Sequence, residues 1–374
     1  MKVALLVPGG VDRSGTDRVV PCLLDLIASL VGQGDEVHVF ALQHEPVPGS
    51  WSLRGATVRN AGSRPRSLRT LRSLYAEHRH GRFDVIHAVC FWTRTAAVGA
   101  AASWLLRAPL VLTLLDGEVV GHPAIGFGGQ LTARSRLGLR VAAGRAQVVT
   151  TQSDFMRDLA LGAGIAARTA GLGVDLRHWP ARSPCPREAG APLRLLHIGR
   201  FTAIKDHITL LEAMALLRSA GPSFELELIG DGALRAAIER AVQQLDLAQI
   251  VRFRPAMLRS ELRPWFERAD LLVVSSIHEG APIVALEAAI AGVPTVGTAV
   301  GHIADWAPQA AVAVPVGDAP ALAAAVRELA RDEPRRLRLA AAAQRAAEPF
   351  HADRSTQAFR EIYGAAMSAS SPRP

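Results

Sequence analysis

Short apolar runs alternate with helix-like patterns along most of this chain. Residues 2–7 form an apolar run, residues 19–31 place seven apolar side chains on one helical face, and residues 36–42 form the next run. A strand, a helix and a second strand in this order predict a βαβ unit with parallel strands. Further apolar runs follow at 84–89, 109–115 and 147–151. The predicted fold class is α/β, built on a doubly wound parallel sheet.

A proline-rich stretch divides this pattern in two. Four prolines and a glycine fall within residues 179–192, a density that neither a helix nor a central strand accepts. The alternation restarts at 193–198, and 374 residues exceed what one hydrophobic core usually serves. We therefore predict two Rossmann-like domains that face each other across a cleft. The expected parts are an N-terminal domain over 1–178, the linker over 179–192, a second domain over 193–347, a C-terminal helix over 348–366 that packs back toward the first domain, and a disordered tail over 367–374.

Two basic side chains flank a turn after the run at 193–198. Arg200 follows Gly199 directly, and Lys205 comes five residues later. Arg offers a planar fork to phosphate and Lys a point charge, so the pair suits a diphosphate. Lys205 is informative because only two of the 42 basic residues are lysines. The alternative is a solvated surface charge.

A second motif follows the run at 271–275. Pro282 suits the first turn of a helix, so the amides from Gly280 to Val284 would face an anion at the helix's positive end. Glu279 precedes this helix, whereas Glu287 lies inside it among apolar residues, where an unpaired carboxylate is costly. Two partners for Glu287 stay open: an Arg in a buried ion pair, or a hydroxyl of a ribose or sugar.

The order and spacing of these residues resemble the family 4 retaining glycosyltransferases of GT-B fold, the group 1 type. The resemblance rests on Glu279 and Glu287 with seven residues between them, on Arg200 and Lys205, and on Gly173-Val174-Asp175 ahead of Trp179-Pro180. Weaker supporting segments are residues 14–19, 84–88, 229–232 and 291–294. Together they cover most of the chain.

The resemblance implies a donor site in the second domain. Arg200 and Lys205 would bind the diphosphate of a nucleotide sugar, Glu279 would contact the transferred hexose, and Glu287 would hold the ribose. Arg200, Lys205 and Glu279 are thus the expected catalytic residues, acting by positioning and by stabilising the leaving diphosphate. The other expected donor contacts are Gly15, Gly199, Gly280, Ala281, Pro282 and Ile283.

The first domain supplies further candidates. Gly15 lies in a glycine loop that the resemblance puts beside the donor phosphate, and a simple turn is the alternative. His87, near the end of the run at 84–89, either faces the cleft or is a structural histidine. Asp116 and Glu118 are candidates for acceptor or sugar contact, because Asp116 precedes Gly117 where the family often has a His-Gly pair. Three other positions depart from the family: Ala281 for Phe, His302 for Gly and Asp305 for Glu.

Positive charge is concentrated in the first half. Residues 1–180 hold 20 Lys and Arg against 13 Asp and Glu, whereas residues 181–374 hold 22 against 21. An acidic lipid, a phosphorylated acceptor or a nucleic acid would explain this, and so would a coding bias toward Arg. The basic segment 64–75 is either a helix that rests on an anionic membrane or an ordinary core-packing helix. We do not expect nucleic acid, because interleaved aromatic residues are lacking.

The spacing of the cysteines and of the acidic residues indicates the redox compartment and whether a metal site is expected. The three cysteines are far apart, which fits a reducing compartment. No Asp-x-Asp pair or ligand-spaced cluster occurs, so we predict no metal and no cofactor, the nucleotide sugar being a substrate. The function we expect is a cytoplasmic, metal-independent retaining hexosyltransferase with peripheral contact at the inner membrane face. It would use a UDP or GDP sugar and a glycan, lipid-linked or small-molecule acceptor. The competing hypothesis is a catalytically silent GT-B protein that acts as a binding or assembly partner.

Overall fold

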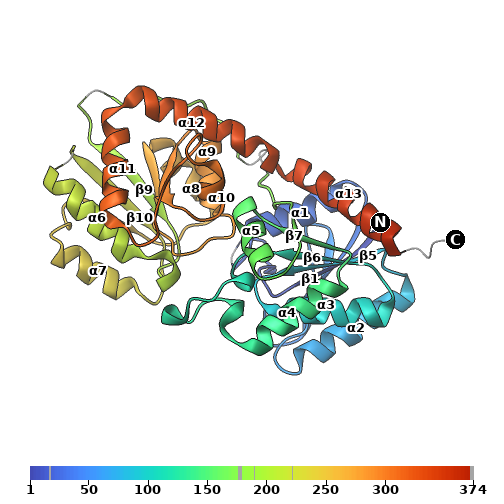
Figure 1. The fold of residues 1–374 in the computed structure, drawn as a ribbon. Helices are drawn as coiled ribbons and strands as arrows, with labels where there is room; N and C mark the ends of the chain where they lie inside the picture. The colour runs from blue at the N-terminus through green and yellow to red at the C-terminus, as the bar shows by residue number, and fades with distance from the viewer. Residues whose placement is uncertain (17, 176–178, 189, 221, 371–374) are drawn as a thin grey trace. The chain divides into compact units, whose positions relative to one another are not determined.

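The computed structural model describes residues 1–16, 18–175, 179–188, 190–220 and 222–370. Its packing divides the chain into two compact units (Figure 1). Unit 1 comprises Met1–Asp175 and Phe350–Pro374, and unit 2 comprises Leu176–Pro349. The predicted boundary residues 176–178, residue 189 of the linker and residues 371–374 of the tail lie outside the described residues.

Unit 1 is built on an eight-stranded sheet in the order β3-β4-β2-β1-β5-β6-β7-β8, parallel except between β3 and β4. Its strands are β1 Lys2–Val7, β2 Glu36–Ala41, β3 Gly49–Leu53, β4 Ala56–Asn60, β5 Val85–Cys90, β6 Leu110–Leu114, β7 Val148–Thr151 and β8 Arg168–Thr169. Its helices are α1 Pro21–Gly32, α2 Arg66–His80, α3 Thr93–Leu106, α4 Ala133–Arg145, α5 Asp154–Gly162 and α13 Ala352–Ser370, with 3-10 turns at Gly117–Val119, Pro123–Ile125 and Gly129–Leu131. Helices α2, α3 and α4 cover one face and α1 and α13 the other (Figure 1). The central strands are mostly apolar because both faces are covered.

Two details of unit 1 differ from the sequence prediction. The hairpin of β3 and β4 was not expected; its two-residue turn, Arg54-Gly55, has φ of 52° and 83°, as a tight hairpin requires. Helix α1 begins at Pro21 rather than Val19, because Val20 is extended and proline suits the first helical turn.

The C-terminal helix α13 belongs to unit 1, where it packs against α1, β5 and β6. Ser29 Oγ donates to the Asp353 carboxylate at 3.0 Å. Arg360 Nε lies 3.2 Å from the buried Asp35 carboxylate. The helix continues to Ser370, so residues 367–370 are helical and not part of a disordered tail.

Unit 2 is built on a six-stranded parallel sheet in the order β11-β10-β9-β12-β13-β14. Its strands are β9 Leu193–Ile198, β10 Phe224–Ile229, β11 Val251–Arg254, β12 Leu271–Val274, β13 Thr295–Thr298 and β14 Val312–Val314. Its helices are α6 His207–Ala220, α7 Arg235–Gln244, α8 Arg259–Arg268, α9 Ile283–Ile290, α10 Gly301–Trp306, α11 Ala319–Arg331 and α12 Glu333–Ala347, with 3-10 turns at Ala203–Lys205 and Glu348–Phe350. Helices α11 and α12 divide at Asp332, whose carboxylate caps α12 by accepting from the Arg335 amide at 2.9 Å.

Residues 179–188 of the predicted linker pack on unit 2. The Arg182 amide donates to the Ile290 carbonyl at 2.9 Å. The Trp179 indole donates to the Glu287 carbonyl at 3.1 Å. These bonds make the segment part of the second unit.

Helix α2 contains the basic amphipathic segment predicted over 64–75. Leu74 is fully buried, whereas Leu68 and Tyr75 are about half exposed. The apolar face thus packs on the core only in part, and contact with a membrane surface stays a prediction. Within the residues described here, no helix has the length and apolar character needed to cross a membrane.

Candidate functional site

Three loops meet at one edge of the unit 2 sheet. Strand β9 lies between β10 and β12, and all three run parallel, so the loops after them leave from the same edge. The Ile277 amide donates to the Ile204 carbonyl at 2.8 Å. Ser275 Oγ donates to the Lys205 carbonyl at 2.9 Å. These bonds fasten the loop after β12 to the loop after β9, so the two predicted motifs lie together.

Lys205 and Glu279 form an ion pair across these two loops. Ser276 Oγ donates to the same carboxylate oxygen of Glu279 at 2.6 Å. The Lys205 and Glu279 side chains both remain partly open to solvent. A cation and an oriented carboxylate are therefore available side by side at the sheet edge.

Arg200 lies on the turn after β9 with its side chain exposed. Among the described residues, its guanidinium group makes no hydrogen bond or ion pair. The turn itself is held by the buried Phe201 and by Gly230. A Cβ on Gly230 would lie 2.0 Å from the Gly199 carbonyl oxygen, so this close approach requires glycine. The arginine is thus a free charge on a fixed backbone.

The loop from Gly280 to Pro282 leads into α9. Pro282 is the N-cap residue, and the helix begins one residue later than predicted, at Ile283. Gly301 closes on this loop at φ 49°, and a Cβ there would lie 2.8 Å from Pro282 Cδ. Ala281 and Ile283 stay half-buried beside the start of α9. His302, which departs from the family pattern, is buried and stacks on Trp306 with ring centroids 5.2 Å apart.

Glu287 has an arginine partner. Its carboxylate is in a side chain only 3% exposed and accepts from Arg259 Nε at 2.8 Å. Arg259 in turn lies over the Trp179 ring, 5.6 Å from the centroid. The buried ion pair, one of the two alternatives for Glu287, is therefore present, and a ribose contact would have to join it.

Two histidines lie buried under the Gly199 turn. The rings of His197 and His207 are 4.8 Å apart, and His197 Nδ1 is 2.9 Å from the Val273 carbonyl. Burial lowers the pKa of His197 to about 4 and that of His207 to about 2. Both rings are neutral at pH 7, so the positive charge at this edge comes from Arg200 and Lys205.

Two family models match the chain. Residues 19–174 match the glycosyl transferase 4-like domain, and residues 192–332 match glycosyl transferases group 1. The D-inositol 3-phosphate glycosyltransferase of Arthrobacter sp. strain FB24 is 30% identical, over 79% of this chain and 76% of the relative. The chain belongs to the group 1 glycosyltransferases.

Solved structures of other proteins share the fold of this group 1 glycosyltransferase. Sucrose-phosphate synthase from Thermosynechococcus elongatus superposes with a TM-score of 0.82 at 20% identity, over 98% of this chain and 99% of that one. The Anabaena protein HepE, in complex with UDP-glucose, gives a TM-score of 0.73 at 18% identity, over 97% and 99%. The predicted GT-B fold of two Rossmann-like parallel sheets is confirmed.

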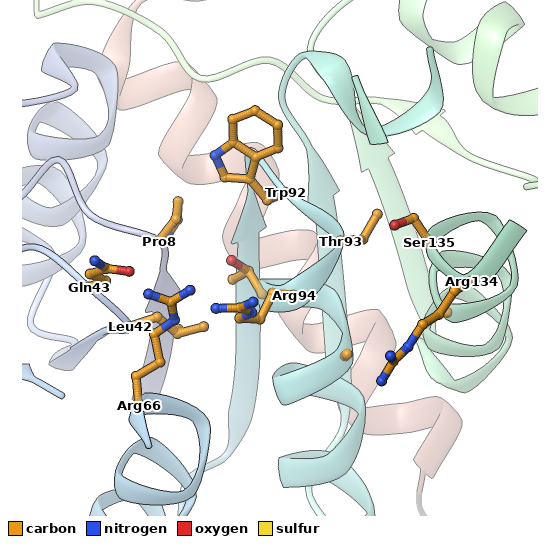
Figure 2. A pocket seen from close by; sticks show the side chains of 12 residues that line it. Pro8, Leu42, Gln43, Arg66, Trp92, Thr93, Arg94, Arg134 and Ser135 are labelled. Atoms are coloured by element: carbon orange, nitrogen blue, oxygen red, sulfur yellow. The ribbon is translucent and has the colours of Figure 1, made fainter. Parts of the chain in front are cut away.

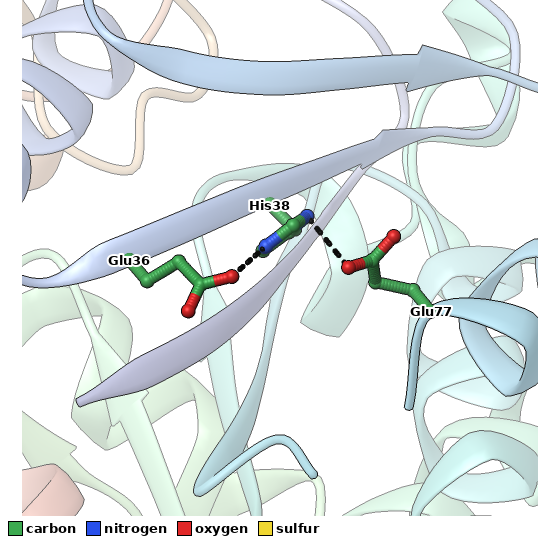
Figure 3. Close-up of side chains that lie close together, drawn as sticks. All are labelled: Glu36, His38 and Glu77. Carbon is green, nitrogen blue, oxygen red and sulfur yellow. Dashed lines mark hydrogen bonds and ion pairs between the residues drawn. The ribbon is translucent and has the colours of Figure 1, made fainter. Parts of the chain in front are cut away.

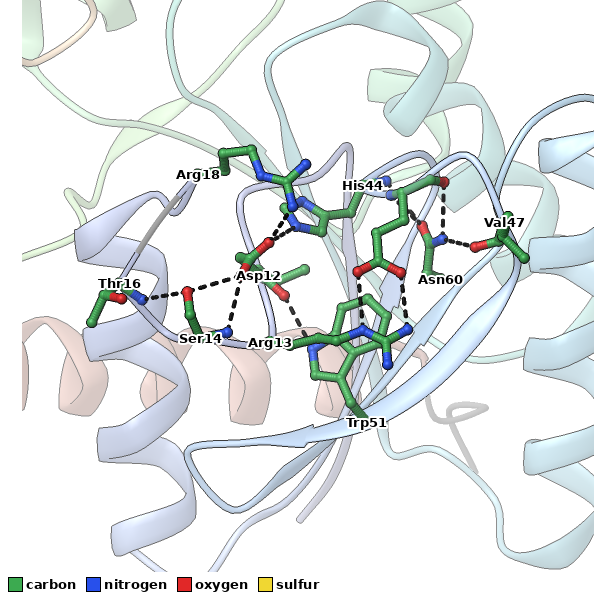
Figure 4. Close-up of polar contacts among 11 residues, drawn as sticks. Asp12, Arg13, Ser14, Thr16, Arg18, His44, Val47, Trp51 and Asn60 are labelled. Carbon is green, nitrogen blue, oxygen red and sulfur yellow. Dashed lines mark hydrogen bonds and ion pairs between the residues drawn. The ribbon is translucent and has the colours of Figure 1, made fainter. Parts of the chain in front are cut away.

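The glycine loop of unit 1 is organised around a carboxylate of its own (Figure 4). Asp12 accepts from the Ser14 amide at 3.0 Å and from Arg18 at 2.6 Å, and His44 Nε2 lies 3.1 Å away. The hydrogen bond from the Ser14 amide is the largest of the causes that hold the pKa of Asp12 well below its usual range. Gly15 lies in the turn at φ 67° and donates to the Asp12 carbonyl. The turn is closed by its own hydrogen bonds, and contact of Gly15 with a donor phosphate stays a prediction.

His87 is fully buried in this glycosyltransferase, as a structural histidine would be. Its Nδ1 lies 2.7 Å from the Tyr363 hydroxyl of α13, and its Nε2 lies 2.6 Å from Thr113 Oγ1 of β6. Burial lowers the pKa of His87 to about 3, so the ring is neutral. His87 joins α13 to the sheet.

Glu118 is also fully buried and braces the loop after β6. Its carboxyl oxygens accept from the Asp116 amide at 2.9 Å and from the Leu115 amide at 3.3 Å. Burial raises the pKa of Glu118 to about 8. Asp116 is half-buried beside it, so of these two candidates only Asp116 lies near the surface.

Sequence spacing did not reveal one acidic cluster. Glu36, His38 and Glu77 bring their ligand-type atoms within 4.8 Å of one another (Figure 3). Lys2 Nζ lies 3.1 Å from both glutamates, and Arg59 lies 2.5 Å from Glu77. The cations neutralise the carboxylates, which makes this an ion-pair network between β2 and α2.

Three residues at the unit 2 sheet edge were not predicted as site residues. Ser276 lies next to the motif and would be found by its distance of three residues from Glu279. Arg259 is far from Glu287 in the sequence, and His207 carries no local signal at the start of α6. Only the packing of α8 against α9 and of α6 under β9 reveals them.

Proposed function

We propose that this glycosyltransferase moves a hexose from a UDP or GDP sugar to an acceptor hydroxyl, with retention at the anomeric carbon and without a metal ion. The observation that carries the proposal is the Lys205–Glu279 pair together with Arg200, whose guanidinium group has no partner among the described residues. All three lie at the edge of a parallel sheet where ligands bind. The UDP-glucose in the Anabaena structure supports a nucleotide sugar as the donor.

Arg200 and Lys205 would receive the diphosphate. As the bond between the anomeric carbon and the phosphate oxygen breaks, negative charge grows on that oxygen. The two cations stabilise the transition state, in which this charge develops, more than they stabilise the bound substrate. This difference lowers the barrier. The acceptor oxygen forms its bond on the face that the diphosphate leaves, and the acceptor proton passes to the leaving phosphate oxygen.

Glu279 and Glu287 would hold the two sugars of the donor. Glu279 is oriented by Lys205 and Ser276, so its carboxylate can accept hydrogen bonds from hexose hydroxyls. Glu287 pairs with Arg259 and would accept from the ribose. Loss of Glu279 should weaken use of the nucleotide sugar more than binding of free UDP or GDP, whereas loss of Glu287 should weaken both, because both contain the ribose.

Calorimetry with EDTA present tests the donor site. UDP and GDP are titrated into the wild type, into Arg200→Ala with Lys205→Ala, and into Arg331→Ala, an exposed arginine at the end of α11 as control. We expect one nucleotide to bind, the double variant to lose at least a hundredfold in affinity because two charge-assisted contacts disappear, and the control to be unchanged.

Two results would count against the proposal. Unchanged binding in the double variant would remove Arg200 and Lys205 from the donor site. Failure of the wild type to bind either nucleotide would favour the catalytically silent alternative. Hydrolysis of a UDP or GDP sugar with and without EDTA, followed by NMR of the first anomer released, tests metal independence and retention.

A further inference from the structure

A cavity of about 800 Å³ lies within unit 1 (Figure 2). Pro8, Leu42 and Trp92, which line it, follow the carboxyl ends of β1, β2 and β5. Ligands of open parallel sheets bind at this edge. All of its described lining residues belong to unit 1, whereas the loops described above belong to unit 2.

Three arginines line this cavity, and no carboxylate of the described residues does. Arg66 and Arg94 point toward one another, and Arg134 extends from α4 toward α3 (Figure 2). Among the described residues, none of the three guanidinium groups has a hydrogen bond or an ion pair. Arg13 and Arg59, by contrast, are paired with Glu45 and Glu77. Three cations without partners among the described residues therefore line one cavity.

Helix ends add to this charge. Arg66 is the first residue of α2, and Arg94 and Arg134 are the second residues of α3 and α4. Neither α2 nor α3 has a side-chain cap at its N-terminus. The positive ends of three helices of 13 to 15 residues thus face one cavity. Guanidinium forks and uncapped amides together match a phosphate group.

The cavity opens into an apolar groove between α3 and α4. This groove, of about 570 Å³, shares Ala97, Arg134 and Gly138 with the arginine cavity. Besides Arg134 and Arg145, it is lined by apolar and small residues, of which three have large exposed fractions: Trp104 at 76%, Leu137 at 65% and Val141 at 63%. Contiguous exposed apolar surface of this kind marks a binding groove more often than ordinary surface.

We propose that the acceptor of this glycosyltransferase is a lipid that carries a phosphate. Arg66, Arg94 and Arg134 hold the phosphate, and the hydrocarbon chain lies along α3 and α4. A peptide or a soluble sugar would leave its polar groups without partners in the groove, whereas a hydrocarbon chain loses no hydrogen bonds there. This acceptor class rests on the proposed function, because it is the second substrate of the proposed transfer reaction.

The test is calorimetry with hexyl, octyl and decyl phosphate below their micelle concentrations, against inorganic phosphate and glucose 6-phosphate. We expect affinity to rise about fourfold for each methylene that enters the groove. Arg66→Gln with Arg94→Gln should weaken every phosphate by at least tenfold. Leu137→Ser with Val141→Ser should flatten the dependence on chain length while leaving glucose 6-phosphate unchanged.

The controls are exposed residues outside these cavities. Arg72→Gln in α2 and Leu161→Ser in α5 should leave all affinities within twofold. Equal affinity for decyl phosphate and glucose 6-phosphate would overturn the lipid acceptor. So would alkyl phosphate binding that survives loss of Arg66 and Arg94. UDP binding to the same variants is measured in parallel, because its absence would count against the donor site and not against this cavity.

Discussion

Replacement of His87 should remove a defined part of the acid sensitivity of unit 1. Burial holds the pKa of His87 at about 3 against an ordinary value of 6.5, and no charged side chain contributes to this shift. The unfolded chain therefore takes up a proton at this residue before the folded chain does. The contribution of the neutral, buried His87 to the free energy of unfolding is complete above pH 6.5 and is lost as the pH falls toward 3.

The magnitude follows from the distance to the ordinary value. A pH of 5.0 lies 1.5 units below 6.5, the ordinary pKa that His87 has in the unfolded chain. Protonation of the unfolded chain therefore lowers the free energy of unfolding by about 2 kcal/mol relative to pH 7.5. In His87→Gln this loss should disappear. The absolute stability of the variant will also fall, because Tyr363 and Thr113 lose a buried partner. The prediction concerns only the difference between the two pH values.

Thiol labelling during urea unfolding reports on unit 1. Cys22 and Cys90 are buried there, and the exposed Cys185 is replaced by serine. A pyridyl disulfide reagent that reacts at acid pH then measures opening of unit 1 at pH 7.5 and 5.0. The exposed His80→Gln in α2 is the control and should behave as the parent. If His87→Gln loses as much stability between the two pH values as the parent does, burial of a neutral His87 is refuted.

Two further predictions concern loop positions. The pKa of Glu118, raised to about 8, gives a pH dependence of the opposite sign. Its contribution to the free energy of unfolding is complete below pH 4.5 and declines by about 3 kcal/mol up to pH 7. Glu118→Gln should remove this decline, as urea unfolding at pH 4.5 and 7 would measure. Unchanged slopes would show that Glu118 is ionised in the folded chain. Gly230→Ala should destabilise unit 2 by about 2 kcal/mol or more and weaken UDP or GDP binding, because the new Cβ would meet the Gly199 carbonyl that precedes Arg200. Gly364→Ala, which points into open space, is the control, and equal melting temperatures and nucleotide affinities for the two variants would contradict the clash.

Much of the fold follows from local patterns. The apolar runs predicted the parallel strands of both sheets, since a strand covered on both faces must be apolar along its length. The hairpin of β3 and β4 escaped because its strands are short and half polar. Helices α1 and α9 begin one or two residues later than predicted, at positions where a proline stands at or just before the first helical residue.

The candidate site was predictable only to the level of residue lists. Arg200, Lys205, Glu279 and Glu287 stand out by type and spacing, and their positions after two strands predict one sheet edge. Their partners do not stand out. The ion pair of Lys205 with Glu279 depends on β9 and β12 being neighbours, and the pairing of Glu287 with Arg259 depends on how α8 packs against α9.

Sequence alone therefore determined the α/β class, the two parallel sheets and the residue types available for phosphate chemistry, because strand and helix periodicity and turn chemistry are local properties. Tertiary structure decided which of these side chains are open and which are buried. His87 is buried by a helix from the other end of the chain, and three separate arginines share one cavity because α2, α3 and α4 begin at the same edge. Strand order and helix packing bring distant segments together, and no local pattern encodes that order.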